Sequence, residues 1–261
     1  MYGALLAFHS NQHIEESAVF VGLGTVINVA TIAIGSLLGI LVGNRLSSKT
    51  RELLTTVLGS ITLLAAADAL RSAWSPVLAG HLPKGWPILV ILISLLIGAL
   101  IGSLLGIEER LEKLGIFLKK RLDPQGSSPF VDGFVSASLL FVIGPMAILG
   151  SISDGMGTGI QTLVLKSTLD GITSIAFAST LGWGVAVSAV PVGVYQFIWT
   201  AIGFFLGNIL SPYQVLALTA TGGVLLLGIA FRMLNLKQVP VGNLLPSLFI
   251  APVLALALHA L

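Results

Sequence analysis

The sequence has few charged residues and no cysteine. Its 261 residues include 13 Lys or Arg and 11 Asp or Glu, so that 9% are charged, whereas a soluble domain has about 25%. Without cysteine there is no disulfide framework, no thiolate metal site and no cysteine nucleophile. The formal net charge of +2 gives no reason to expect nucleic acid as a partner.

The charged residues are unevenly distributed, and long segments contain none. Residues 17–44, residues 171–230 and everything after Lys237 lack Asp, Glu, Lys and Arg. The composition is 55% apolar and the mean hydropathy is +1.01. A helix crosses a bilayer with about 20 apolar residues. The sequence therefore predicts an all-α polytopic membrane protein and excludes a soluble enzyme, a disordered chain and a coiled coil.

Eight apolar segments are long enough to be transmembrane helices. They cover residues 19–42, 53–73, 88–105, 134–152, 160–181, 185–206, 214–233 and 244–259. We expect residues 1–17 to be an N-terminal extension at the membrane surface and residues 18–261 to form one integral membrane domain. The sixth segment is either one continuous helix or a split or re-entrant one, because it contains Pro191 and begins after Gly182-Trp183-Gly184.

Basic residues predict the orientation, because cytoplasmic loops are enriched in Lys and Arg. They follow the first segment (Arg45, Lys49, Arg51), the third (Arg110, Lys113, Lys119, Lys120, Arg121) and the seventh (Arg232, Lys237). With eight spans these three loops share one side. We therefore predict a protein of the cytoplasmic (inner) membrane, with both termini on the outer side of that membrane. Residues 108–121 are either a helix at the cytoplasmic interface or an extension of the third span.

The first and second segments resemble the sixth and seventh. LGILVGN (38–44) aligns with IGFFLGN (202–208), and the same offset pairs Gly59 with Gly223 and Leu63 with Leu227. Under the predicted topology these copies have opposite orientations, so that segments 1–3 and 6–8 form an inverted repeat. Inverted repeats are typical of secondary transporters. The alternative is a chance alignment of Gly-rich apolar helices.

The fifth segment has polar residues at every fourth position. These are Thr158, Thr162, Lys166, Asp170 and Ser174, which would lie on one helix face. Lys166 and Asp170 can form an ion pair, and charges inside a bilayer are costly. The polar face must therefore point to the bundle interior or to a wet cavity. It is either an ion, proton or substrate pathway, or a buried ion pair that fixes helix register.

A broken helix is predicted near Gly144–Gly157. Pro145 removes a backbone hydrogen bond and clashes with the preceding turn, and Gly144 adds freedom. Broken helices at mid-membrane bind solutes and ions in many transporters. Ser151, Ser153 and Asp154 would provide oxygen ligands there. The alternative is an extracellular turn in which Asp154 is solvated.

Four further polar residues lie inside the predicted spans. Asp68 and Arg232 occupy equivalent positions in the two copies and are gate candidates; alternatively, Arg232 reaches the headgroups. Asn28 and Gln196 lie near mid-span, where we expect them to form hydrogen bonds between helices.

No catalytic, metal-binding or cofactor-binding signature occurs, so we do not expect an enzyme, a metal site or a cofactor. The one catalytic alternative is a Ser–Lys pair between Ser151 or Ser153 and Lys166, which we consider the least favoured.

Three segments of the sequence resemble one known family. They are GTVINVATIAIGSLLG, VIGPMAILGSISDG and KSTLDGITSIAFASTLGWGV. They resemble the bacterial membrane proteins catalogued as domain of unknown function 554 (YqgA-like), and the similarity runs from about Gly24 to the C-terminus. The resemblance implies a shared role for Gly144, Pro145, Gly150, Asp154, Gly155, Lys166, Asp170 and Gly171. It implies no substrate.

The leading hypothesis is a small secondary transporter or ion-conducting protein with a small solute or ion as its partner. In it Asp154 and Asp170 bind a cation or proton, and Lys166 exchanges between Asp170 and an anionic group of the substrate. Gly-rich helix faces would also suit a homodimer in the lipid bilayer. The alternative is a membrane scaffold or sensor that does not transport.

Overall fold

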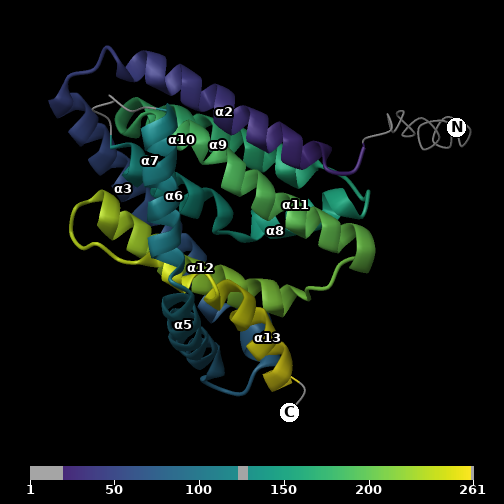
Figure 1. The fold of residues 1–261 in the computed structure, drawn as a ribbon. Coiled ribbons are helices and arrows are strands. Elements are labelled where there is room, and N and C mark those ends of the chain that lie inside the picture. The colour runs from purple at the N-terminus through teal and green to yellow at the C-terminus, as the bar shows by residue number, and fades with distance from the viewer. Residues whose placement is uncertain (1–19, 123–128, 260–261) are drawn as a thin grey trace, which may run out of the picture.

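The structure is a computed structural model that describes residues 20–122 and 129–259, and within these ranges it contains helices and no strand (Figure 1). The predicted extension at residues 1–17 lies outside these ranges. The longer helices are α2 (Leu23–Gly43), α3 (Ser48–Leu70), α5 (Trp86–Leu105), α6 (Ile107–Leu122), α7 (Phe130–Val142), α8 (Pro145–Gly155), α9 (Gln161–Leu181), α11 (Ala189–Leu206), α12 (Pro212–Met233) and α13 (Ser247–His259). The shorter ones are η1 (Arg71–Trp74), α4 (Pro76–His81), α10 (Trp183–Val187) and η2 (Val241–Leu244).

The predicted all-α membrane fold is confirmed. Among the described residues 6 helical segments are long and apolar enough to cross a membrane, or 7 if α7 and α8 together form one bent span. The fifth predicted span (160–181) corresponds to α9, whose 21 residues are long enough but whose polar side chains exclude it on composition, so that 7 and not 8 spans are counted. The sixth span combines α10 and α11, and Pro191 is tolerated because it lies in the first turn of α11.

The predicted helix break is present between α7 and α8. The two helices are bent by 63°, with Gly144 at the bend at φ 143° and Pro145 as the first residue of α8. A positive φ of this size is accessible to glycine and rarely to other residues. The break is shorter than expected, because Gly150 is an ordinary helical residue and α8 continues to Gly155.

Glycines bring α2 and α9 into close contact. A Cβ on Gly35, Gly39 or Gly43 would collide with backbone carbonyl oxygens of α9. Gly98 and Gly102 on α5 likewise lie against the backbone of residues 243 and 247. Such small residues let helices pack closely in lipid. Since these faces are covered within the chain, a homodimer, which stays a prediction, would need another surface.

Helix α6 is separate from the preceding transmembrane helix. Gly106 ends α5 in the left-handed conformation, at φ 58°, and α6 begins at the next residue, Ile107 (Figure 1). The structure thus favours a distinct helix over an extension of the third span. Buried Glu108 and Gly115 lie on the covered face of α6, while Leu114 and Phe117 are exposed beside basic residues.

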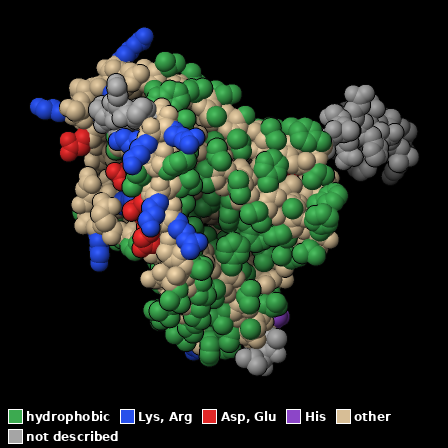
Figure 2. All heavy atoms as spheres, viewed as in Figure 1, with side chains coloured by type: hydrophobic (Ala, Val, Ile, Leu, Met, Phe, Trp, Pro, Cys, Tyr) green, Lys and Arg blue, Asp and Glu red, His purple; other side chains and the backbone are tan. Residues whose placement is uncertain are grey.

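The surface is divided between apolar and charged regions. Large apolar side chains such as Leu64, Leu104 and Phe205 are mostly exposed, at 71%, 87% and 78%, as expected for helices that face lipid. In the face shown in Figure 2, charged side chains gather at one end, over α6 and the neighbouring helix ends. The largest buried apolar cluster includes Ile32 on α2, Phe134 on α7 and Phe177 on α9.

Candidate functional site

Lys166 and Asp170 form a buried ion pair on α9. They are 6% and 8% exposed, and the Lys166 ammonium contacts the Asp170 carboxylate directly. The spacing of four residues places both side chains on the same helix face. The ring centroid of Phe141 on α7 lies 5.9 Å from Lys166 Nζ. The ion pair therefore faces the protein interior and not the lipid.

Asn28 and Gln196 extend this pair across three helices. Asn28 Nδ2 donates to Asp170 Oδ2 at 3.1 Å and to Gln196 Oε1 at 3.1 Å. Both amide side chains are completely buried. The polar chain Lys166–Asp170–Asn28–Gln196 thus runs from α9 through α2 to α11. We call these four residues the central network.

Several buried polar atoms on the same helices and on α8 have no partner. Asn28 Oδ1, Gln196 Nε2, Ser151 Oγ and Trp199 Nε1 make no hydrogen bond within the part of the chain that the structure describes. Leaving such a group unpaired costs about 1–3 kcal/mol. Buried polar atoms usually have a protein, water or ligand partner, so this interior offers unused hydrogen-bonding capacity.

Asp154 caps the N-terminus of α2. Its Oδ1 accepts a hydrogen bond from the Gly22 amide at 3.1 Å, and its Oδ2 accepts one from the Thr25 amide at 3.3 Å. Gly22 has no side chain to supply this cap, and the first amides of a helix lack intrahelical partners. Asp154 is only 2% exposed, which does not fit a solvated turn. It connects α8 to the start of α2.

The polar stripe of the fifth span divides into a buried and an exposed part. Ser174 is buried, and its hydroxyl donates to the Gly171 carbonyl. Thr162 and Thr158 are exposed, and Thr158 lies in the turn before α9, where its hydroxyl donates to the Ser153 carbonyl at 3.1 Å. Ser153 is half-buried. Among the stripe residues, Lys166, Asp170 and Ser174 are those inside the bundle.

The two gate candidates do not meet. Asp68 lies 3.8 Å from Arg71, and both side chains are 84% exposed. Arg232 is instead buried, with its side chain 10% exposed and its Nη1 2.5 Å from Glu108 Oε1. It also approaches Glu112 at 3.8 Å and Asp132 at 3.7 Å. Arg232 is therefore held by carboxylates of α6 and α7.

Glu108 is the residue of this cluster that sequence reasoning missed. It is 6% exposed and also accepts a hydrogen bond from the Gly242 amide at 2.6 Å. Asn243 Oδ1 in turn accepts from the Glu108 amide at 2.9 Å, which caps α6. In the sequence, the position of Glu108 just after Gly106 marks the start of a helix. No neighbouring residue identifies Arg232 as the partner of Glu108.

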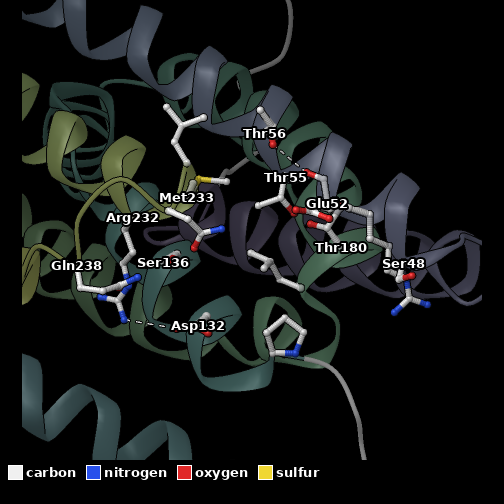
Figure 3. Close-up of a pocket in the computed structure, with 15 residues that line it drawn as sticks. Ser48, Glu52, Thr55, Thr56, Asp132, Ser136, Thr180, Arg232, Met233 and Gln238 are labelled. Carbon is white, nitrogen blue, oxygen red and sulfur yellow. Dashed lines mark hydrogen bonds and ion pairs between the residues drawn. The ribbon is translucent and has the colours of Figure 1, made fainter.

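A polar pocket of about 530 Å³ lies at the charged end, between α3, α7, α9 and α12 (Figure 3). Figure 3 shows Glu52, Asp132 and Thr180 around it, with Arg232 and Gln238 at one side. Arg51, predicted in the basic loop after the first span and found in the first turn of α3, and Arg232 both line it. The structure thus brings two of the predicted cytoplasmic basic regions to one place; the cytoplasmic assignment stays a prediction.

The structure contains no Ser–Lys pair and no metal cluster in residues 20–122 and 129–259. The Ser151 hydroxyl has no hydrogen-bond partner and so does not contact Lys166. No three His, Cys, Asp or Glu side chains come together there as metal ligands.

The apolar helices and the buried polar interior define a multi-pass membrane protein. Residues 23–256 match the family described as "Protein of unknown function (DUF554)". The chain belongs to this family, and the resemblance seen in the sequence is confirmed.

Two relatives match along nearly their whole length. One is the "Uncharacterized membrane protein YdfK" of Bacillus subtilis (strain 168), 30% identical over 238 residues, which are 91% of this chain and 97% of the relative. The other is the "Uncharacterized protein YqgA" of Escherichia coli (strain K12), 28% identical over 237 residues, 90% of this chain and 97% of the relative. No solved structure matches the chain.

Proposed function

We propose that this protein is a secondary transporter or ion-conducting protein of the cytoplasmic membrane that moves a small solute or ion. The observation that carries the proposal is the central network, in which a buried ion pair is linked through Asn28 to Gln196 on another helix. Ionisable residues inside membranes usually mark ion or substrate pathways, because lipid makes them costly. Asp170 and Lys166 are the proposed ion- and substrate-binding groups.

Reciprocal contacts between α3 and α12 support an inverted repeat. A Cβ on Gly59 would lie 2.9 Å from Leu234 Cγ, and a Cβ on Gly223 would lie 2.9 Å from Leu70 N. Gly223 follows Gly59 by 164 residues, and Leu234 follows Leu70 by the same number. A twofold relation produces such exchanged pairs. Two inverted halves can alternate between inward-open and outward-open conformations.

The pocket at the charged end is the proposed cytoplasmic mouth of the pathway. Its wall includes Ser136 on α7 and Thr180 on α9. Farther along the same two helices lie Phe141 and Asp170, and a helix rises about 1.5 Å per residue. The central network is therefore about 15 Å from Thr180 along α9. Both charged residues are enclosed in this conformation, which fits an occluded state.

The test is flux through purified protein in liposomes. Imposed gradients of H⁺, Na⁺ or K⁺, each followed with an ion-sensitive dye, should dissipate faster with wild type than with empty liposomes. Asp170→Asn should lose this flux, while Asp68→Asn, an exposed matched control, should retain it. Absence of flux in wild type for these ions and for a panel of small organic solutes would refute the proposal.

The second candidate is a membrane scaffold or sensor that does not transport. The observation that favours it is structural use of the acidic groups, since Asp154 caps α2 and Asp170 is paired with Lys166. In that case the ion pair fixes helix register and the basic α6 contacts anionic lipid. Replacing the pair would then change stability alone.

A further inference from the structure

The interface between α8 and α11 contains buried polar groups that the central network does not use. Ser151 on α8 is fully buried, as is Gln196 on α11, and Trp199 on α11 is 6% exposed. Ser151 Oγ, Gln196 Nε2 and Trp199 Nε1 have no partner among the described residues. The Tyr195 hydroxyl on α11 also lacks a partner there, so that four unpaired polar groups lie on two contacting helices, and each one costs stability.

Close packing of the two helices brings these groups to one interface. A Cβ on Gly155 of α8 would collide with the Thr200 carbonyl, and a Cβ on Gly203 of α11 would collide with the Ile152 carbonyl. Trp199 is in one apolar cluster with Ile152, the residue next to Ser151. The Trp199 ring also stacks on Phe249 with the ring centroids 5.6 Å apart. The indole N–H is therefore held in a fixed place.

The unpaired groups are mainly hydrogen-bond donors. The amide nitrogen of Gln196 and the indole nitrogen of Trp199 can only donate, and the Ser151 hydroxyl can donate as well. The group that complements them is rich in acceptors. A carboxylate has two oxygens with about four lone-pair sites and accepts the strongest hydrogen bonds. Lys166 is connected to Gln196 through Asp170 and Asn28.

We propose that Ser151, Gln196 and Trp199 bind the carboxylate group of a small organic acid. This inference rests on the proposed function, because it names the chemical class of the transported solute. Gln196 belongs both to this site and to the central network, since its Oε1 accepts from Asn28. Binding at the site is thereby connected to the Lys166–Asp170 pair.

The test measures equilibrium binding to the purified full chain in detergent, which needs no flux. The probes are sodium acetate and sodium lactate, and the controls are sodium chloride at equal ionic strength and acetamide, a neutral analogue of acetate. Binding is followed by calorimetry and by the midpoint of thermal unfolding. We expect saturable binding of the carboxylates and none of chloride or acetamide.

Three variants each remove one donor. Gln196→Glu keeps the oxygen that accepts from Asn28 but replaces the amide donor with a negative charge, and Trp199→Phe and Ser151→Ala remove one N–H or O–H. Each should raise the carboxylate Kd about tenfold or more. Ser188→Ala is the matched control, because this fully buried hydroxyl just before α11 already donates to the Val185 carbonyl, and it should change Kd less than about twofold.

The outcomes separate this inference from the proposed function. Unchanged Kd in the folded donor variants, or no saturable carboxylate binding by wild type, overturns the inference and means that the donors bind ordered water only. If wild type still carries H⁺, Na⁺ or K⁺ in that case, the proposed function stands. If Gln196→Glu or Trp199→Phe fails to fold, the carboxylate Kd of Ser151→Ala, the smallest change, decides whether the inference stands.

Discussion

Replacing the buried ion pair one residue at a time should destabilise the protein far more than replacing both residues together. Lys166→Met leaves the Asp170 carboxylate buried without its counter-ion, and Asp170→Asn does the same to the Lys166 ammonium. Both side chains are enclosed. Removing one partner of such a pair costs about 3–5 kcal/mol. We expect this loss in each single variant.

The double variant Lys166→Met/Asp170→Asn should recover most of this stability. It leaves no buried charge, and a neutral replacement of similar size is often close to wild type in stability. The amide introduced by Asp170→Asn would also retain an oxygen that can accept from Asn28 Nδ2, the contact that Asp170 makes at 3.1 Å. The coupling free energy of the double-mutant cycle should therefore be about 3 kcal/mol or more.

The assay is reversible unfolding in mixed micelles, with the free energy obtained from an SDS titration of all four proteins. If the two single losses simply add in the double variant, the two groups are not coupled and the central network is wrong. Flux measured on the same proteins adds a second result. If the central network binds the transported solute or ion, the double variant should be folded but should show no flux.

Three other predictions follow from packing, capping and the charged cluster, each measured by the same titration. Gly39→Val should destabilise the protein by about 1–3 kcal/mol or more, because a Cβ at this position would collide with the Ile175 carbonyl. The control is Gly80→Ala, where no atom lies near the added Cβ. Equal losses of stability in the two variants would contradict the close α2–α9 contact. Asp154→Ala should cost about 1 kcal/mol as α2 loses its cap, and an effect no larger than that of exposed Asp68→Ala would argue against capping. Glu108→Gln should cost about 1–3 kcal/mol and increase hydrogen exchange at the start of α6; unchanged exchange would mean that Arg232 does not hold this helix.

The sequence predicts the helices well because lipid imposes simple rules. A backbone inside a bilayer must satisfy its own hydrogen bonds, so apolar segments of sufficient length become helices. Pro145 next to Gly144 predicts the bend, because both residues act on the local backbone. The interior position of Lys166 and Asp170 follows from their cost in lipid. These inferences need no knowledge of distant contacts.

Partners far apart in the sequence are what sequence reasoning missed. The sequence predicts that Asp154 binds an ion or is solvated, yet it caps a helix that begins more than a hundred residues earlier. The repeat aligns Arg232 with Asp68, whereas the ion-pair partner of Arg232 is Glu108. A repeat relates equivalent positions, and equivalent positions need not touch.

The glycines of α2 and the polar residues of α9 act together. In lipid no hydrophobic effect drives helices together, so close van der Waals contact and hydrogen bonds must do so. Gly35 lets α2 approach α9 until its Cα lies against the Gly171 carbonyl. Asn28, two turns earlier on the same helix, then reaches Asp170. A larger residue at Gly35 would move α2 outwards and break that hydrogen bond, leaving the carboxylate without one of its two donors. The glycine spacing that indicates packing in the sequence is therefore also a condition for the central network.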